Sequence, residues 1–390
     1  MRPALWLCGA LSCAPKESVP AARPASVRFR PGDPSDEAGR WLVESVPRAQ
    51  WDLGLARAAS TLLSLAQDRR AALDPAATQA VLAREGYPGP ARFSRVLTGG
   101  ALPDGLIDEI VGSAPDDLPI DVGLAGRTYG DGLTLWVAGW APRYADLDPM
   151  PRDLPLDGTL AVRVELPPQA DARLYLVPPD GPVEELSLTS KVSRWVDHFE
   201  RPGAYRMSVG YQDGEVTRVA LVWSVFVGVD PPLPSPLRPL PPTPDPVAAE
   251  ATLYDALNTL RATHGLPPVQ RFSTFEPLCR EHAALMAAHG QVAHALPGVT
   301  EGVAERAKGQ FHPRAEHHED VAAAASAADV LALVEGSPAH LSNLLCAACT
   351  HVSIGAALEP ALDRPPRLFV TWELLRFPNG PPQPVDHYNR

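Results

Sequence analysis

The strongest constraint on the fold of this 390-residue chain is a proline-rich run at residues 231–246, which reads Pro-Pro-Leu-Pro-Ser-Pro-Leu-Arg-Pro-Leu-Pro-Pro-Thr-Pro-Asp-Pro. Proline lacks a backbone N–H and has a fixed φ, so this run can form neither the interior of a helix nor a central strand. We expect a polyproline II spacer of roughly 50 Å, at about 3.1 Å per residue; a PxxP ligand for another protein is the alternative. Residues 231–247 are therefore predicted to link an N-terminal part to a separate C-terminal domain.

The composition is that of a globular protein with an acidic surface. Hydrophobic residues make up 45% of the chain and charged residues 21%, which suffices for packed cores in the two or three domains expected at this length. The formal net charge of −12 argues against nucleic acid or an anionic membrane surface as the main partner.

Residues 1–13 have the pattern of an export signal. Arg2 supplies a positive charge, an apolar stretch follows at 4–11, and Cys13 comes after small or apolar residues. This end is similar to a bacterial lipoprotein signal, in which the cysteine is lipidated, although Ala10 stands where such signals have leucine. We expect export to the periplasm, the outer membrane or the cell surface, with membrane contact only through a lipid anchor. A misplaced start or an unprocessed apolar N-terminus is the alternative.

The hydrophobic pattern predicts two folded parts before the proline-rich run. After a tether at 14–35, residues 36–145 combine helical and strand patterns, which predicts a mostly helical α+β domain. Residues 150–230 change to a period of two with recurring turn signals such as Asp157-Gly158. That pattern predicts an immunoglobulin-like β-sandwich.

The C-terminal domain, residues 248–378, contains most of the histidines: ten of the eleven lie between His264 and His387. Its helical patterns precede its strand patterns, which predicts an α+β fold, and residues 379–390 form a tail. The expected helices cover 250–264, 273–290, 321–334 and a segment from Ser337, and the expected strands cover 351–358 and 367–374.

Short motifs in this domain follow one another in a recognisable order. They are Leu-Asn-Thr-Leu-Arg at 257–261, histidines at 282 and 294 around Met286 and Gly290, Glu-Asp-Val-Ala from Glu319, Ser-Pro-Ala-His-x-x-Asn at 337–343, and Val-Ser-Ile-Gly at 352–355. This order resembles the bacterial SCP-like branch of the CAP superfamily of cysteine-rich secretory, antigen 5 and pathogenesis-related proteins. The resemblance implies an α-β-α sandwich with a cleft in which two histidines and up to two glutamates converge.

Three residues of this chain match that cleft. His294 and His340 match the two histidines, and Glu319 matches the first glutamate, unless Glu301 or Glu305 takes its place. The second glutamate has no clear match, which puts a mechanism with two carboxylates in doubt. Two imidazoles and one carboxylate are a donor set for Zn²⁺ or another divalent cation. A polar ligand-binding cleft without a specific metal is the other interpretation.

A further departure from the family pattern follows Glu319 directly: Asp320 stands where the family has asparagine.

Three cysteines remain after the predicted export signal: Cys279, Cys346 and Cys349. In an exported protein, Cys346-Ala-Ala-Cys349 is a candidate disulfide. Free buried thiols and a zinc site are the alternatives, although a structural zinc site usually has a second cysteine pair.

These observations favour a binding or envelope-associated module over an enzyme. The family resemblance implies a lipid, a sterol or a cell-envelope component as ligand. A metal-assisted hydrolase acting on peptides or envelope polymers is the alternative. A third hypothesis is a structural surface protein whose β-sandwich binds the partner and whose CAP cleft is vestigial.

The N-terminal domain has weak sequence similarity to the C-terminal one. Residues 111–115 are similar to 334–338, and Leu133-Thr-Leu-Trp136 is similar to the strand that ends at Trp372. One hypothesis is that 36–145 is a degenerate CAP-like copy that lacks the histidines. Chance similarity is the alternative.

Overall fold

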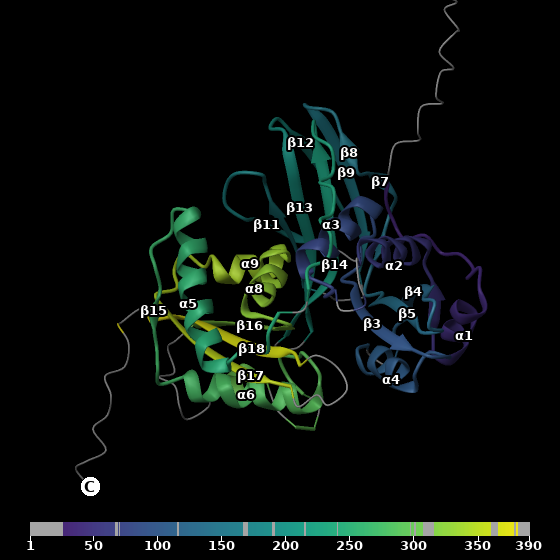
Figure 1. Cartoon of the computed structure of the whole chain (residues 1–390). Helices are drawn as coiled ribbons and strands as arrows, with labels where there is room; N and C mark the ends of the chain where they lie inside the picture. The colour runs from purple at the N-terminus through teal and green to yellow at the C-terminus, as the bar shows by residue number, and fades with distance from the viewer. Residues whose placement is uncertain are drawn as a thin grey trace, which may run out of the picture.

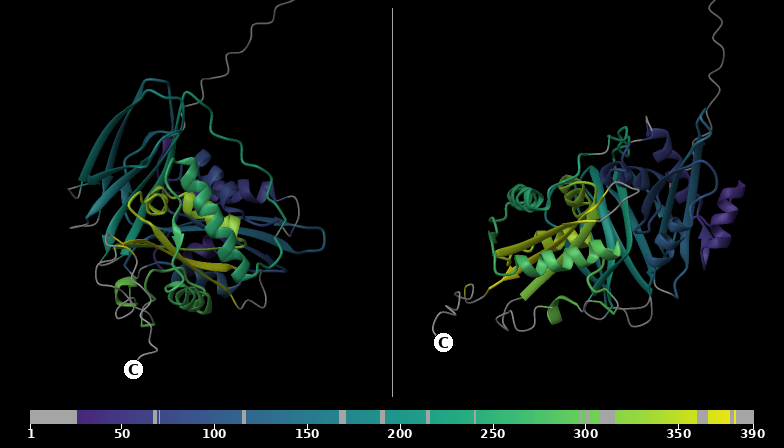
Figure 2. Two further views of the ribbon diagram at one scale, coloured as in Figure 1. Left: turned by 90° about the vertical axis from the view of Figure 1, so that its left-hand side faces the viewer. Right: turned by 60° about the horizontal axis from the view of Figure 1, so that its bottom comes forward.

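The computed structural model describes residues 26–66, 69, 71–114, 117–166, 171–188, 192–213, 216–239, 241–296, 298–299, 302–306, 316–359, 366–377 and 380. The predicted export signal with Cys13 lies outside the described residues, as does nearly all of the predicted tail. Within the described ranges, no helix is both long and apolar enough to cross a membrane. Two α/β units lie on either side of a unit of long β-strands (Figures 1 and 2).

The N-terminal unit has a four-stranded sheet in the order β2-β4-β5-β3. Helix α3 shows how the sequence sets its elements: the Asp74 carboxylate accepts from the Ala77 amide at the helix start, Pro75 follows, and Gly86 ends the helix in the left-handed region. The elements are α1 (Glu37–Ser45), β2 (Ala49–Trp51), α2 (Leu53–Leu65), α3 (Pro75–Glu85), β3 (Arg92–Thr98), α4 (Asp104–Gly112), β4 (Ile120–Thr128) and β5 (Thr134–Pro142).

The middle unit consists of two sheets that share one core. Alternate residues such as Leu160, Leu174 and Val209 point inward and are buried together. The sheets have the orders β11-β10-β13-β14-β8 and β12-β9-β6, and β1 pairs with β7. The immunoglobulin-like assignment stays a prediction. The strands are β1 (Ser26–Val27), β6 (Asp146–Leu147), β7 (Met150–Pro151), β8 (Asp153–Leu154), β9 (Gly158–Glu165), β10 (Ala172–Val177), β11 (Glu184–Leu188), β12 (Val192–Phe199), β13 (Gly203–Asp213) and β14 (Val216–Val227).

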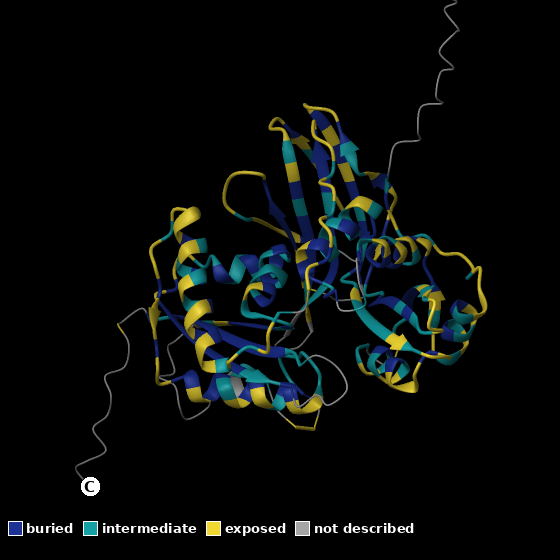
Figure 3. Cartoon of the chain, viewed as in Figure 1, coloured by how far each residue is buried: buried dark blue, intermediate teal, exposed yellow. Residues whose placement is uncertain are grey.

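The C-terminal unit has a sheet in the order β15-β17-β18-β16, with α6 on one face and α5, α8 and α9 on the other (Figure 1). The buried residues concentrate in these strands and on the inner sides of the helices (Figure 3). Its elements are α5 (Pro246–Thr263), β15 (Gln270–Arg271), α6 (Glu276–His289), α7 (Val303–Arg306), β16 (Glu316–Ala324), α8 (Ala327–Glu335), α9 (Pro338–Leu344), β17 (His351–Leu358) and β18 (Leu368–Arg376).

One expected helix begins later than its sequence pattern suggests. The helix predicted at 321–334 begins at Ala327, because Val321 to Ala324 form the end of strand β16. The alanines of this stretch favour a helix on their own. Pairing with β18 along the edge of the sheet overrides that preference.

The two α/β units have the same topology. Each sheet has a short strand parallel to its neighbour, followed by two antiparallel pairs, in the same order along the chain. In the register, Val122 lies opposite Trp140 as Ile354 lies opposite Trp372, and both tryptophans are buried. This correspondence supports the hypothesis of a degenerate copy. It pairs Trp372 with Trp140 instead of the Trp136 that the sequence comparison suggested.

The proline-rich segment differs from the expected free spacer. Leu237 is buried in the core of the N-terminal unit, and its amide donates to the Leu65 carbonyl. The guanidinium of Arg238 lies 3.5 Å from carboxylate oxygens of both Asp74 and Asp329, which belong to different units. Leu237 and Arg238 are adjacent non-proline residues, so the segment has here a backbone donor and an apolar side chain to dock with. It therefore ties the units together.

Further hydrogen bonds join the C-terminal unit to the other two. The Gln79 side chain of α3 donates to the Ala332 carbonyl of α8 at 3.2 Å. In the middle unit, Arg206 donates to the Glu335 carbonyl at 2.7 Å, and the Ser208 hydroxyl accepts from the Ala339 amide at 3.1 Å.

We predict that alanine at Gly123 or Gly355 destabilises the protein by about 2 kcal/mol or more, because a Cβ there would overlap helix backbone. At Gly123 it would meet the Ala56 nitrogen of α2, and at Gly355 the Arg280 nitrogen of α6. The control is Gly105→Ala in α4, where nothing lies within 4 Å of the added carbon. Urea denaturation measures the difference, and a Gly355→Ala variant as stable as the control would contradict the close helix approach.

Candidate functional site

The edge strand β16 carries two consecutive acidic residues that face opposite sides of the sheet. Side chains alternate along a strand. Val321, two residues after Glu319, packs against Met286 of α6, so Glu319 belongs to the α6 face. Asp320 belongs to the other face, where the Asn343 side-chain amide of α9 donates to it at 3.0 Å. The predicted site residues therefore lie on two faces that meet at the sheet edge.

Glu319 is a buried carboxylate whose two oxygens each have a partner. Its Oε1 lies 2.9 Å from His294 Nδ1, and its Oε2 accepts a hydrogen bond from Arg306. Arg306 also donates to the His294 carbonyl at 2.6 Å. Burial on its own would raise the pKa of Glu319, but the hydrogen bond with His294 and the charge of Arg306 outweigh it and hold that pKa below its usual value. The sequence paired His294 with Glu319 but contained no signal that singled out Arg306.

A second carboxyl group lies directly across the sheet. Glu373 of β18 is opposite Glu319 in the strand register and is only 1% exposed. Burial raises the pKa of Glu373 well above its usual range, and the charge of Glu319 and its hydrogen bond to Glu373 raise it further. The direction of this shift favours the protonated form of Glu373 beside an ionised Glu319. The motifs did not point to this residue; its only signal is an acidic side chain inside an otherwise apolar strand.

The other face contains His340 and Asp320. Burial lowers the pKa of His340 to about 4, with a smaller contribution from the nearby charge of His294, so this imidazole is neutral at pH 7. Burial also raises the pKa of Asp320 to about 7. Its Oδ2 has no hydrogen-bond partner among the described residues. His340 and Asp320 thus form a second, weakly charged polar group next to the first.

These residues do not fit a shared divalent cation in this arrangement. Both oxygens of Glu319 are engaged, and Arg306 supplies the positive charge that a metal would otherwise bring. His340 lies on α9, on the other side of the strand from Glu319. We therefore derive no metal-dependent step, and a metal held by His294, Glu319 and His340 stays a prediction.

The remaining candidates have other surroundings. His282 Nε2 lies 3.0 Å from the Ala293 carbonyl, and burial lowers the pKa of His282 to about 4, as befits a core histidine. Cys346 and Cys349 form a disulfide, whereas Cys279 is a buried free thiol. Glu301 and the side chain of Glu305 lie outside the described residues.

A cavity of about 690 Å³ lies where the three units meet. Its walls come from α3 and β3 of the N-terminal unit, β14 of the middle unit, and β16, α8 and α9 of the C-terminal unit. His340 lines this cavity, whereas His294 and Glu319 are not among its described lining residues. Most of the lining is apolar, as at Leu82, Phe93, Val222 and Leu333.

Arg92 of β3 is the most unusual charge in that lining. Its side chain makes no hydrogen bond or ion pair within the part of the chain that the structure describes. Desolvation by the protein around the cavity lowers the pKa of Arg92, and the positive charge of Arg367 lowers it further, although the residue itself is exposed to solvent. Arg92 is an exposed residue that lines the cavity, so its guanidinium is accessible to an anionic group of a ligand.

The C-terminal unit is a four-stranded sheet between helices, an α-β-α sandwich. Residues 254–372 match the family model of the cysteine-rich secretory protein family, CAP. The C-terminal third of the chain is therefore a CAP domain, which confirms the family that the motifs predicted over 248–378.

Similar solved structures include three proteins from bacteria. An outer surface protein of Borrelia burgdorferi is 19% identical, with 33% of this chain and 94% of that chain covered and a TM-score of 0.29. An extracellular SCP-domain protein of Bacillus anthracis is 17% identical, with 56% and 78% covered and a TM-score of 0.30. A cysteine-rich secretory protein of Staphylococcus aureus is 13% identical, with 70% and 91% covered and a TM-score of 0.24. Among curated proteins, none matches this chain significantly.

We predict that substitution by glutamine lowers the free energy of unfolding much more at Glu319 than at Glu373. Glu319→Gln removes the negative partner of Arg306 and should cost about 3 kcal/mol or more of unfolding free energy at pH 7. Glu373→Gln replaces the protonated acid that the raised pKa favours with a neutral amide of the same shape, and should cost less than about 1 kcal/mol. Urea denaturation of both variants is the measurement. Equal losses would show that Glu373 is ionised.

We also predict that Asp320→Asn stabilises the protein at high pH. The folded-state pKa of Asp320 is above its unfolded value, so the stability that its protonated form provides is present below about pH 4 and is lost as pH rises through about 7. Asparagine avoids this loss and still accepts from Asn343, so the gain at pH 8 should be on the order of 3 kcal/mol and vanish near pH 4. The control is Asp197→Asn on strand β12. A pH-independent difference would refute the prediction.

Proposed function

We propose that this chain is an exported ligand-binding protein of the cell envelope whose ligand occupies the cavity between its three units. The observation that carries the proposal is the cavity itself: about 690 Å³, within the range of roughly 300–1,000 Å³ typical of small-molecule sites. Export and a lipid anchor at Cys13 belong to the same proposal. They would place the cavity at a membrane surface.

The lining favours a lipid with an acidic group. Its apolar side chains suit an acyl chain or another hydrocarbon body. Arg92 suits a carboxylate or a phosphate at one end of it. A sterol would fill the apolar part but would leave the guanidinium without an acceptor. Among lipid, sterol and envelope components, the acidic acyl lipid therefore fits the described residues best.

The cleft residues support binding more than hydrolysis. A general base must reach a substrate proton within hydrogen-bond distance. Both oxygens of Glu319 already have partners, and Glu373 is 1% exposed. The pair Glu319 and Glu373 thus has a structural role at the edge of the sheet. Of the predicted site residues, His340 is the one that a ligand in the cavity would touch.

Titration of the full chain with the fluorescent fatty acid cis-parinaric acid tests the proposal. We expect saturable binding that is abolished by Ala323→Trp, which places a large side chain in the cavity wall, and retained in Ala161→Trp on an exposed position of β9. Circular dichroism of both variants verifies that they are folded. Unchanged binding in a folded Ala323→Trp variant would refute the cavity as the binding site.

The role of Arg92 is tested by comparing the binding of a fatty acid with that of the corresponding alcohol. Arg92→Gln should weaken binding of the acid about 10-fold, the value of one charge-assisted hydrogen bond, and leave binding of the corresponding alcohol unchanged. An equal effect on both ligands would mean that Arg92 does not recognise the acidic group.

A further inference from the structure

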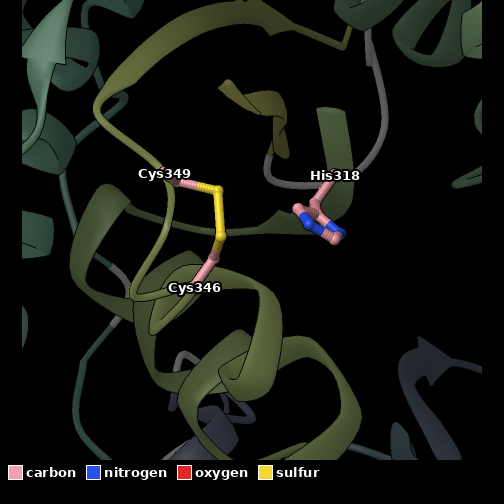
Figure 4. Close-up of side chains that lie close together, drawn as sticks. All are labelled: His318, Cys346 and Cys349. Atoms are coloured by element: carbon pink, nitrogen blue, oxygen red, sulfur yellow. A yellow bond between two sulfur atoms is a disulfide. The ribbon is translucent and has the colours of Figure 1, made fainter. Parts of the chain in front are cut away.

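A second group of potential metal ligands lies on the other face of the C-terminal sheet from Glu319. His318 is an exposed residue of β16, and Cys346 and Cys349 lie in the loop between α9 and β17. The ligand atoms of these three residues lie within 4.8 Å of one another, and no other group of three or more His, Cys, Asp or Glu among the described residues does so. Figure 4 shows the His318 ring beside the disulfide.

The loop that carries the two cysteines is held by a buried arginine. Arg261 of α5 is fully buried and donates to the carbonyls of Leu344 at 2.8 Å, Cys346 at 3.1 Å and Cys349 at 3.5 Å. Its Nε donates to the Pro267 carbonyl at 3.0 Å. These bonds use backbone oxygens only. The loop conformation is therefore supported by contacts that do not depend on the bond between the sulfur atoms.

The histidine is fixed by an independent element. His318 lies opposite Leu374 in the register of β16 and β18, so its backbone position is set by the sheet. Within the loop, the Cys349 amide donates to the Cys346 carbonyl at 3.2 Å, which closes a tight turn between the cysteines. Two separate supports thus bring one imidazole and two sulfur atoms to the same place.

We propose that the reduced chain binds one Zn²⁺ ion through Cys346 Sγ, Cys349 Sγ and the imidazole of His318, and that the disulfide is the metal-free state of the same site. A dithiol reductant supplies two electrons and two protons, breaks the S–S bond and leaves two thiols while it is itself oxidised to a disulfide. Zinc then displaces both thiol protons. Two thiolates and one neutral imidazole balance the charge of the ion and leave its fourth tetrahedral position to water.

The donor set selects the kind of metal. Thiolate and imidazole ligands suit zinc and its spectroscopic substitute cobalt, whereas calcium and magnesium require oxygen ligands. A disulfide oxidant accepts two electrons from the Cys346 and Cys349 thiolates and two protons from solvent to become a dithiol, while the thiolates form their S–S bond again and cease to be ligands. The bound metal is then released, so the site is a redox-controlled one.

Cobalt titration tests this site directly. The full chain is reduced with a phosphine, freed of reductant without air and titrated with Co²⁺. We expect one equivalent to bind, with thiolate-to-cobalt charge-transfer absorption and visible tetrahedral bands, and Zn²⁺ to displace it. The oxidised chain should show none of these bands. His318→Ala should weaken binding by about 10-fold or more, and Cys346→Ser should abolish the charge-transfer band.

Controls separate this site from the other candidate ligands. His198→Ala on an exposed position of β12 and Cys279→Ala in the core should leave the titration unchanged. Because His318 is exposed, we expect His318→Ala to remain folded, and circular dichroism of the variant verifies this. Two results would overturn the proposal: a reduced chain that binds no cobalt, or binding that survives Cys346→Ser and is lost instead in His294→Ala or His340→Ala.

Discussion

The pairing of the edge strand β16 with β18 is the constraint on which the chemistry of the C-terminal unit depends. It places Glu319 opposite Glu373 on one face and turns Asp320 toward Asn343 on the other. The same register places His318 beside the cysteine loop. Since side chains alternate along a strand, a slip of one residue would exchange these faces and bury the wrong groups. Apolar packing on both faces, against α6 and against α8, fixes the register.

That register also brings two carboxyl groups together, and residues that precede β16 in the chain stabilise the charge on one of them. Two carboxyl groups directly opposite each other in a buried sheet cannot both be ionised at low cost. Arg306 and His294 stabilise the charge on Glu319, and the raised pKa of Glu373 favours its protonated form. The resulting cluster has little net charge, which explains how so many titratable groups are accommodated beside the hydrophobic core.

The sequence predicted some of these features and could not predict others. Motif order identified the CAP domain and paired His294 with Glu319, because those side chains are set by local segments of the chain. Glu373 depends on a register between strands about 50 residues apart, which no local pattern encodes. The alanines after Val321 favour a helix, so the strand that carries Glu319 was missed. The burial of Leu237 differs from the free spacer that the proline-rich run predicts, because burial of one apolar residue depends on a surface that the sequence does not reveal.

Although the two α/β units have the same topology, they place different residues at corresponding positions of their sheets. In the register of each sheet, Arg92 lies opposite Trp140 as Asp320 lies opposite Trp372, so these two residues hold corresponding positions. Arg92 lines the cavity, whereas Asp320 is buried and bound by Asn343. A symmetric dimer would have to present the same residue on both sides of such a cavity. One chain with two units of matching topology but different residues escapes that requirement. Its cavity can therefore have distinct ends and hold a molecule in a single orientation.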